Sequence, residues 1–148
     1  MGKLALAQQH LTEGLDLARE VGDRYTEPLL LAGLADVHKD LARYDKAIEL
    51  RLAAHEMIMA GMRGHESDSL NGLGELYAEA GLADQARQWF ERAIAVTGER
   101  GERHQHGRAL AGLGRLLGSR EHLLAAIDIL DAVSPLEAEQ VRQALDAL

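Results

Sequence analysis

A short phrase, glycine and leucine followed by a small residue, recurs three times in this sequence at a nearly constant interval. The copies are Gly33-Leu34-Ala35, Gly72-Leu73-Gly74 and Gly112-Leu113-Gly114, and their leucines are 39 and 40 residues apart. A period of this size is typical of a solenoid, in which each unit buries its apolar face only against its neighbours. We therefore expect a repeat architecture that offers an extended surface to a partner.

The composition favours helices as the repeating elements. Hydrophobic residues make up 47% of the chain but aromatic residues only 3%, so most of the apolar content is alanine and leucine. Both are strong helix formers, and β-branched residues are scarce. The only prolines are Pro28 and Pro135, and neither position requires a proline inside a helix. The expected fold class is all-α.

The charge and the residue types exclude several classes of protein. A net charge of −8 without a basic stripe argues against nucleic acid as a partner of this chain. The absence of cysteine excludes disulfides and thiolate metal sites. No apolar run approaches the length of a membrane span, and Met1-Gly2-Lys3 leads into a helical pattern rather than a signal peptide. We expect a cytoplasmic protein without membrane contact.

Apolar spacing predicts eight helices with short connections. We expect the first to end near Gly22, the second to carry Pro28 in its first turn, and the fourth to end at Gly81. The third is expected at about 45–62 with Asp45 as N-cap, and Ser67 is the expected N-cap of the fourth. The last, at 135–148, follows Ser134-Pro135-Leu136-Glu137, a pattern that predicts a capping box between Ser134 and Glu137.

The middle repeat resembles a tetratricopeptide repeat (TPR). The resemblance rests on Leu70-x-x-Leu73-Gly74-x-x-Tyr77, on Gly81, and on Ala86-x-x-x-Phe90-x-x-Ala93. The first repeat matches more loosely, with His38 at the tyrosine site and Arg51 at the phenylalanine site. The third keeps the leucines and small residues but ends on Val133. The resemblance implies a right-handed α-solenoid of antiparallel helix hairpins.

The long period is similar to a TPR variant found in bacterial signalling regulators, kinesin light chains and cell-polarity adaptors. The segments 15–24 and 137–142 are similar to parts of actinobacterial regulators that carry such arrays after nucleotide-binding or DNA-binding domains. One domain over 1–148 is then expected. Its parts would be a half repeat at 3–24, repeats at 27–64, 66–103 and 106–133, and a capping helix at 135–148.

The resemblance also implies where a partner binds, because the first helix of each TPR pair lines the concave face. The matching polar positions are Asp36, Lys39, Asp40, Asn71, Glu75, Glu79, Arg108 and Arg115. Asn71 has both a donor and an acceptor, so it could pair with the backbone of an extended peptide whatever its sequence. The alternative interpretation of each residue is an ordinary solvated helix face.

Other chemistry is poorly supported by the sequence. His104 and His106 could hold zinc only with a further ligand from elsewhere, and their loop setting explains them as polar surface. The paired glycines near Leu73 and Leu113 lie inside helical patterns without a preceding strand, which excludes a dinucleotide fingerprint. Asp36 and Glu75 could face each other, but an open groove would not shift a carboxyl pKa enough for acid–base work. We expect no enzyme, metal or cofactor.

The predicted function is a protein- or peptide-binding scaffold or regulatory module that uses the concave face, as part of a bacterial signalling or transcriptional regulator. Two alternatives stay open. The unpaired first helix could form a homodimer by burying its apolar face against a second copy. The chain could also sense a small molecule, for which it would need an enclosed pocket.

Overall fold

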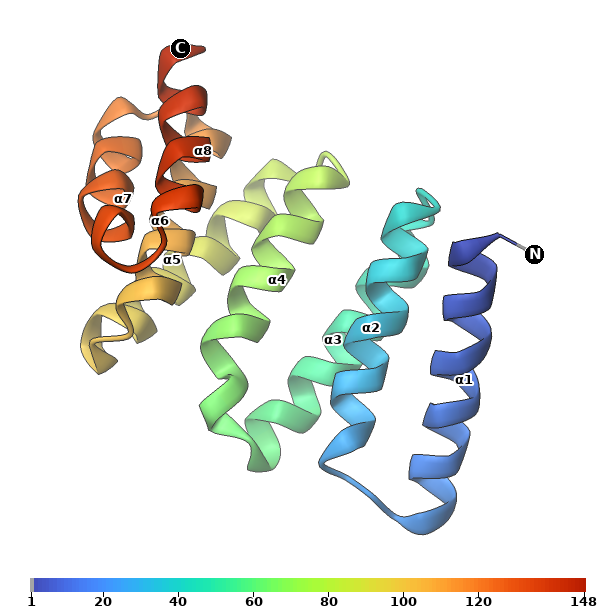
Figure 1. The fold of residues 1–148 in the computed structure, drawn as a ribbon. Coiled ribbons are helices and arrows are strands. Elements are labelled where there is room, and N and C mark those ends of the chain that lie inside the picture. The colour runs from blue at the N-terminus through green and yellow to red at the C-terminus, as the bar shows by residue number, and fades with distance from the viewer. Residues whose placement is uncertain (1) are drawn as a thin grey trace. The chain divides into compact units, whose positions relative to one another are not determined.

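The computed structural model describes residues 2–148 and shows only helices there (Figure 1). The helices are α1 (Lys3–Val21), α2 (Thr26–Asp40), α3 (Tyr44–Gly61), α4 (Glu66–Glu79), α5 (Ala83–Arg100), α6 (Arg103–Leu117), α7 (Arg120–Val133) and α8 (Pro135–Asp146), with a 3₁₀ turn, η1 (Arg63–His65), before α4. No strand occurs in the described residues. The predicted all-α class and the predicted eight helices are confirmed for this part of the chain.

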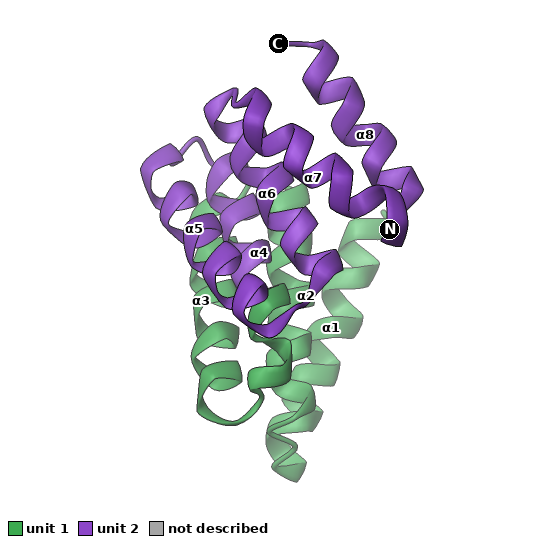
Figure 2. Ribbon diagram, turned by 90° about the vertical axis from the view of Figure 1, so that its left-hand side faces the viewer, with its two compact units in different colours: residues 1–69 green, residues 70–148 purple. Residues whose placement is uncertain are grey.

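The chain forms two compact units (Figure 2). Unit 1 extends to Ser69, and unit 2 comprises Leu70–Leu148, so that α4 contributes its first turn to unit 1 and the remainder to unit 2. In unit 1, α2 packs antiparallel between α1 and α3 (Figure 1). In unit 2, α6 packs against α5 and α7, and α8 packs against α7. The prediction of one domain over the whole length stays a prediction.

Glycines end the helices where the sequence predicts. Gly22 follows α1 with a φ of 71°, and Gly81 follows α4 with a φ of 78°. Only glycine adopts this left-handed conformation without a steric cost, and it lets the next N–H groups satisfy the last carbonyls of the helix. At Gly22 the following residue, Asp23, donates its N–H to the carbonyl of Ala18 at 2.8 Å.

Two of the predicted N-caps are wrong, and at the third, Ser134, the N-cap position is right but the predicted capping box is not. Helix α3 begins at Tyr44, so Asp45 lies in its first turn instead of capping it. Helix α4 begins at Glu66, which leaves Ser67 inside the helix and buried. Ser134 does precede α8, but its side chain makes no capping hydrogen bond, and the capping box does not form. The capping box does not form because Glu137 has another partner: one of its carboxylate oxygens lies 2.7 Å from Nε2 of His104.

The start of α2 is instead held by Asp23, which lies in the connection between α1 and α2. Its Oδ1 accepts the N–H groups of Tyr25 at 3.1 Å and Thr26 at 3.0 Å. Hydrogen bonds from Thr26 are the main reason why the pKa of Asp23 lies below its ordinary value. The carboxylate thus supplies acceptors for backbone donors that a helix start leaves unpaired.

The core of unit 2 is built around Phe90, whose side chain is buried between two helices that approach closely. A Cβ at Gly74 would lie 2.7 Å from the Phe90 ring, and a Cβ at Gly112 would also overlap it. Close helix crossing therefore explains Gly74 and, by the same contact, Gly112. Trp89 packs against the neighbouring cluster of Leu70, and its ring stacks on Tyr77 with centroids 6.3 Å apart.

At the position in unit 1 that corresponds to Phe90, the side chain is polar instead of aromatic. Arg51 occupies the site that Phe90 fills in unit 2, and its side chain is mostly buried. Its Nη2 donates to Oδ1 of Asp36 at 2.9 Å, while its buried Nε has no hydrogen-bond partner. His38, at the tyrosine site, has a buried Nδ1 without a partner, and burial lowers its pKa. The inner packing of unit 1 therefore contains polar groups where unit 2 has aromatic ones.

Candidate binding surface

The predicted residues of unit 1 form a small charged group on α2. Asp36 is exposed and accepts a hydrogen bond from Arg51. Nζ of Lys39 lies 3.9 Å from Oδ1 of the same carboxylate. Asp40 is exposed at the end of the helix. The structure thus brings Asp36 and Lys39 together, but the carboxylate of Asp36 is already engaged by two cations.

Asn71 is placed differently from the expectation of a side chain available to a peptide. It is fully buried, and its Nδ2 donates to the backbone carbonyl of Gln105 at 3.0 Å and to Oε1 of Gln105 at 2.9 Å. Its Oδ1 is buried without a hydrogen-bond partner. The donor that the prediction assigned to a peptide therefore holds α4 and α6 together within unit 2.

Glu75 and Arg108 form a two-point ion pair between the same two helices. Nε and Nη2 of Arg108 donate to the two carboxylate oxygens of Glu75, at 2.7 and 2.8 Å. The side chains are 42% and 26% exposed, so solvent screens the attraction only in part. This pairing fixes both side chains in orientation and leaves their edges accessible to a ligand.

Arg115 lies about two turns further along α6 than Arg108 and has no ion-pair partner among residues 2–148. Its side chain is exposed and lines two neighbouring cavities of unit 2. The first, of about 150 Å³, is polar and reaches α8 through Glu137 and Gln140. The second, of about 470 Å³, is open and includes Glu79. Glu75 borders both cavities.

The structure therefore groups Glu75, Glu79, Arg108 and Arg115 on one side of unit 2. The sequence missed Gln105, although it precedes Arg108 by one helical turn and so shares its face. It also missed Glu137 and Gln140, because nothing in the spacing of α8 indicates which helix it covers. That Glu75, Glu79, Arg108 and Arg115 share one continuous binding face with Asp36 stays a prediction.

The histidines that suggested metal binding have other partners. His104 pairs with Glu137, and Nδ1 of His106 lies 2.8 Å from Oγ1 of Thr97, within hydrogen-bond distance. In the part of the chain that the structure describes, no group of three or more histidine, aspartate or glutamate side chains is placed to hold a metal ion. None of the helices between residues 2 and 148 combines the length and apolar character needed to cross a bilayer.

Comparisons with known proteins identify the family. A family model described as tetratricopeptide repeat matches residues 25–99, and the chain belongs to this family. The fold is also similar to the crystal structure of BtubC (BKLC) from P. vanneervenii, with a TM-score of 0.74 and 16% sequence identity. That likeness covers 90% of this chain, which spans 59% of the length of the other chain. A comparison with curated proteins gives no match.

These findings confirm the predicted fold class, an all-α TPR-like solenoid, and the TPR resemblance itself. TPR repeats generally mediate protein–protein interactions. At 16% identity the likeness to BtubC shows the fold alone. The matched range begins at Tyr25, beside the first residue of α2, and ends at Glu99, near the end of α5.

Proposed function

We propose that this chain is a protein-binding module in which the side of unit 2 that carries Glu75, Arg108 and Arg115 binds a peptide segment of a partner. The observation that carries the proposal is the exposed guanidinium of Arg115, unpaired within residues 2–148 and flanked by two cavities. A planar guanidinium with free donors favours a carboxylate, which it can hold by two parallel hydrogen bonds. We therefore expect an acidic group of the peptide at Arg115.

The neighbouring ion pair supports the same site. Glu75 and Arg108 hold each other in a fixed orientation, so they lose little side-chain freedom when a ligand arrives. The polar groups of Glu137 and Gln140 at the smaller cavity add positions for hydrogen bonds. A binding surface with pre-oriented polar groups gives specificity without enclosing the ligand.

We further propose that the module is not catalytic and works in the bacterial cytoplasm within a signalling or transcriptional regulator. The two carboxylates considered for acid–base work are each used in an ion pair, Asp36 with Arg51 and Glu75 with Arg108. The regulator context is supported by the similarity of segments 15–24 and 137–142 to actinobacterial regulators. In that setting the partner is a protein rather than nucleic acid or a membrane.

To test the proposal, peptides that bind the whole chain are selected from a displayed random library. The affinities of the selected peptides are then measured for the wild type and for variants. Arg115→Glu should weaken the binding of peptides that carry acidic residues, because it replaces an attraction by a repulsion. Arg120→Glu, at the exposed start of α7, is the matched control and should have no effect. If no peptide is enriched, or if Arg115→Glu and Arg120→Glu bind alike, this side of unit 2 is not the site.

One observation favours self-association as a second function. Leu6, Leu17 and Val21 lie on one side of α1 and are 46%, 59% and 68% exposed, while the opposite side of α1 packs against α2. A second copy of the chain could bury this stripe. Light scattering should then show a dimer that Leu17→Glu converts to a monomer; a wild-type monomer at every concentration rejects the idea. Sensing of a small molecule stays a prediction of the sequence alone.

A further inference from the structure

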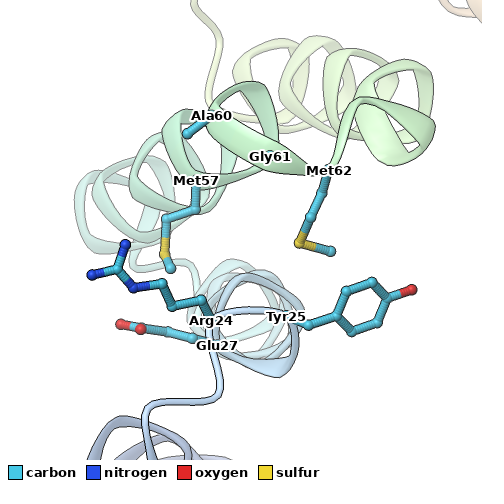
Figure 3. Close-up of a pocket in the computed structure, with 7 residues that line it drawn as sticks. All are labelled: Arg24, Tyr25, Glu27, Met57, Ala60, Gly61 and Met62. Carbon is cyan, nitrogen blue, oxygen red and sulfur yellow. The ribbon is translucent and has the colours of Figure 1, made fainter.

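Unit 1 contains a cavity of about 550 Å³ that none of the predicted site residues lines. It lies where the turn before α2 meets the last turn of α3 (Figure 3). Its lining residues are Arg24, Tyr25, Glu27, Met57, Ala60, Gly61 and Met62. A cavity of this volume is within the range that holds a ligand of a few amino-acid residues.

Two methionines and a tyrosine make the walls of this cavity apolar. The side chains of Met57, in α3, and of Met62, directly after it, extend toward the turn that carries Arg24 and Tyr25 (Figure 3). The Tyr25 side chain is 60% exposed, but its ring is held from the side by His65, with ring centroids 5.9 Å apart and its hydroxyl 3.3 Å from Nε2. Methionine adapts to differently shaped apolar groups. The cavity is therefore suited to an apolar side chain.

The cavity presents a cation to a ligand, although the chain as a whole carries −8. Two charged residues line it, Arg24 and Glu27. Glu27 is already engaged, since its carboxylate accepts a hydrogen bond from Nε of Arg19 at 2.8 Å and its side chain is only 18% exposed. Arg24 is exposed and forms no ion pair or side-chain hydrogen bond within residues 2–148. The charge available to a ligand is thus a guanidinium, which favours a carboxylate.

The end of α3 adds backbone acceptors at the edge of the cavity. The last carbonyls of a helix have no donor within it. Here Met62 donates its N–H to Ile58 and His65 donates to Met62, and the carbonyls of Ala60 and Gly61 accept no backbone hydrogen bond from the described residues. The space beside Gly61 is open, because apart from its chain neighbours and the backbone of its own helix no atom lies within 4 Å of where its Cβ would be. A peptide backbone can approach there and donate its N–H groups.

We propose that this cavity is a second binding site of the chain, for a partner peptide in which an apolar side chain neighbours an acidic residue. The apolar side chain lies between Met57 and Met62 above the Tyr25 ring, and the carboxylate pairs with Arg24. The backbone of the peptide donates to the end of α3. A free anionic amphiphile would match the first two features but not the last, and so a peptide is the favoured occupant. The site is independent of Arg115.

The methionines offer a direct readout. The chain has four methionines, and in the whole protein with ¹³C-labelled methionine methyl groups, Met57 and Met62 report on the cavity. Met59 is on the same helix but does not line the cavity, and it serves as an internal control. The probes are blocked hexapeptides in which leucine, methionine or phenylalanine stands beside glutamate, and the same peptides with lysine instead. We expect the glutamate peptides to shift the Met57 and Met62 signals more than the Met59 signal.

Charge reversal makes the test specific. Arg24→Glu should weaken binding of the glutamate peptides by about fivefold, and it should improve binding of the lysine peptides by a similar factor. Arg120→Glu, in unit 2, is the control for total charge and should change neither. In the Met57 and Met62 signals, which report only on the cavity of unit 1, Arg115→Glu should leave the dependence on peptide concentration unchanged, even though it removes binding of an acidic peptide on unit 2. This readout separates failure of this site from failure of the site on unit 2.

Four results would overturn the proposal. The first is that no glutamate peptide shifts Met57 or Met62. The second is that Arg24→Glu and Arg120→Glu bind the peptides equally. The third is a shift of the same two signals with rising protein concentration in the absence of peptide, which would identify a second copy of the chain as the occupant. The fourth is binding of decanoate as tight as that of the best peptide, which would identify an amphiphile.

Discussion

The packing around Phe90 predicts that unit 2 tolerates no side chain at Gly112. A Cβ there would lie 2.5 Å from Cζ of Phe90 and closer still to Cε1. The optimal separation of two carbon atoms is about 3.5–4.0 Å, so the ring would have to move by about 1 Å or more. It has little room to do so, because its side chain is only 1% exposed and Gly74 contacts it as well.

The expected magnitude is a balance of two effects. Overpacking a well-filled core costs about 1–3 kcal/mol, and the confinement of Phe90 places this case near the upper end. Replacement of glycine by alanine inside a helix gains about 1 kcal/mol, because alanine loses less conformational freedom on folding. Gly112→Ala should therefore lower the free energy of unfolding by about 2 kcal/mol.

The assay is urea unfolding followed by the fluorescence of Trp89, the single tryptophan, which lies in unit 2. Gly14→Ala is the matched control, since a Cβ there meets only Leu30 at an ordinary 3.5 Å. Followed by circular dichroism, it should gain up to about 1 kcal/mol. In a Phe90→Leu background the cost of Gly112→Ala should fall by about 1–2 kcal/mol, because the clashing ring atoms are gone.

Either of two results would refute this reasoning. One is a Gly112→Ala protein that unfolds at the same urea concentration as the wild type or a higher one. The other is an equal loss of stability with phenylalanine and with leucine at position 90. Both would mean that the glycine is present for a reason other than the close approach of α6 to α5.

Three further predictions concern the polar groups of unit 1. Lowering the pH from about 7 to about 5 should destabilise unit 1, because burial keeps the pKa of His38 below 6.5 in the folded chain and the unfolded chain therefore binds the proton first. Urea unfolding followed by circular dichroism should show this loss, and His38→Gln should make the free energy of unfolding depend less on pH. Asp36→Ala should cost about 1 kcal/mol by leaving the mostly buried Arg51 unpaired, whereas Arg51→Leu should be neutral or stabilising in the same assay. The pKa of Asp23 is lowered in the folded chain, so its contribution to stability is present above pH 3.8 and is lost as the pH falls through the pKa of the folded state. When helicity is followed in an acid titration, Asp23→Asn should lose less of it than the wild type.

The sequence by itself determined the elements of this protein. The 39–40-residue period, the leucine spacing and the glycines at positions 22 and 81 predict the helix-rich repeat and two of its helix ends. These features are local: whether a segment is helical depends mainly on residues three and four apart and on the conformation that glycine allows. Gly74 and Phe90, both part of the TPR pattern, meet in the structure where a Cβ on the glycine would overlap the ring.

Only the tertiary structure decided which polar groups are available to a partner. Asn71 has the spacing of a surface residue, yet Gln105 holds it inside unit 2. Glu137 has the spacing of a capping box, yet it pairs with His104. The cavity beside Arg24 joins segments that no periodic pattern relates. In each case the outcome depends on a side chain more than thirty residues away, and the competition between partners is resolved only when the helices pack.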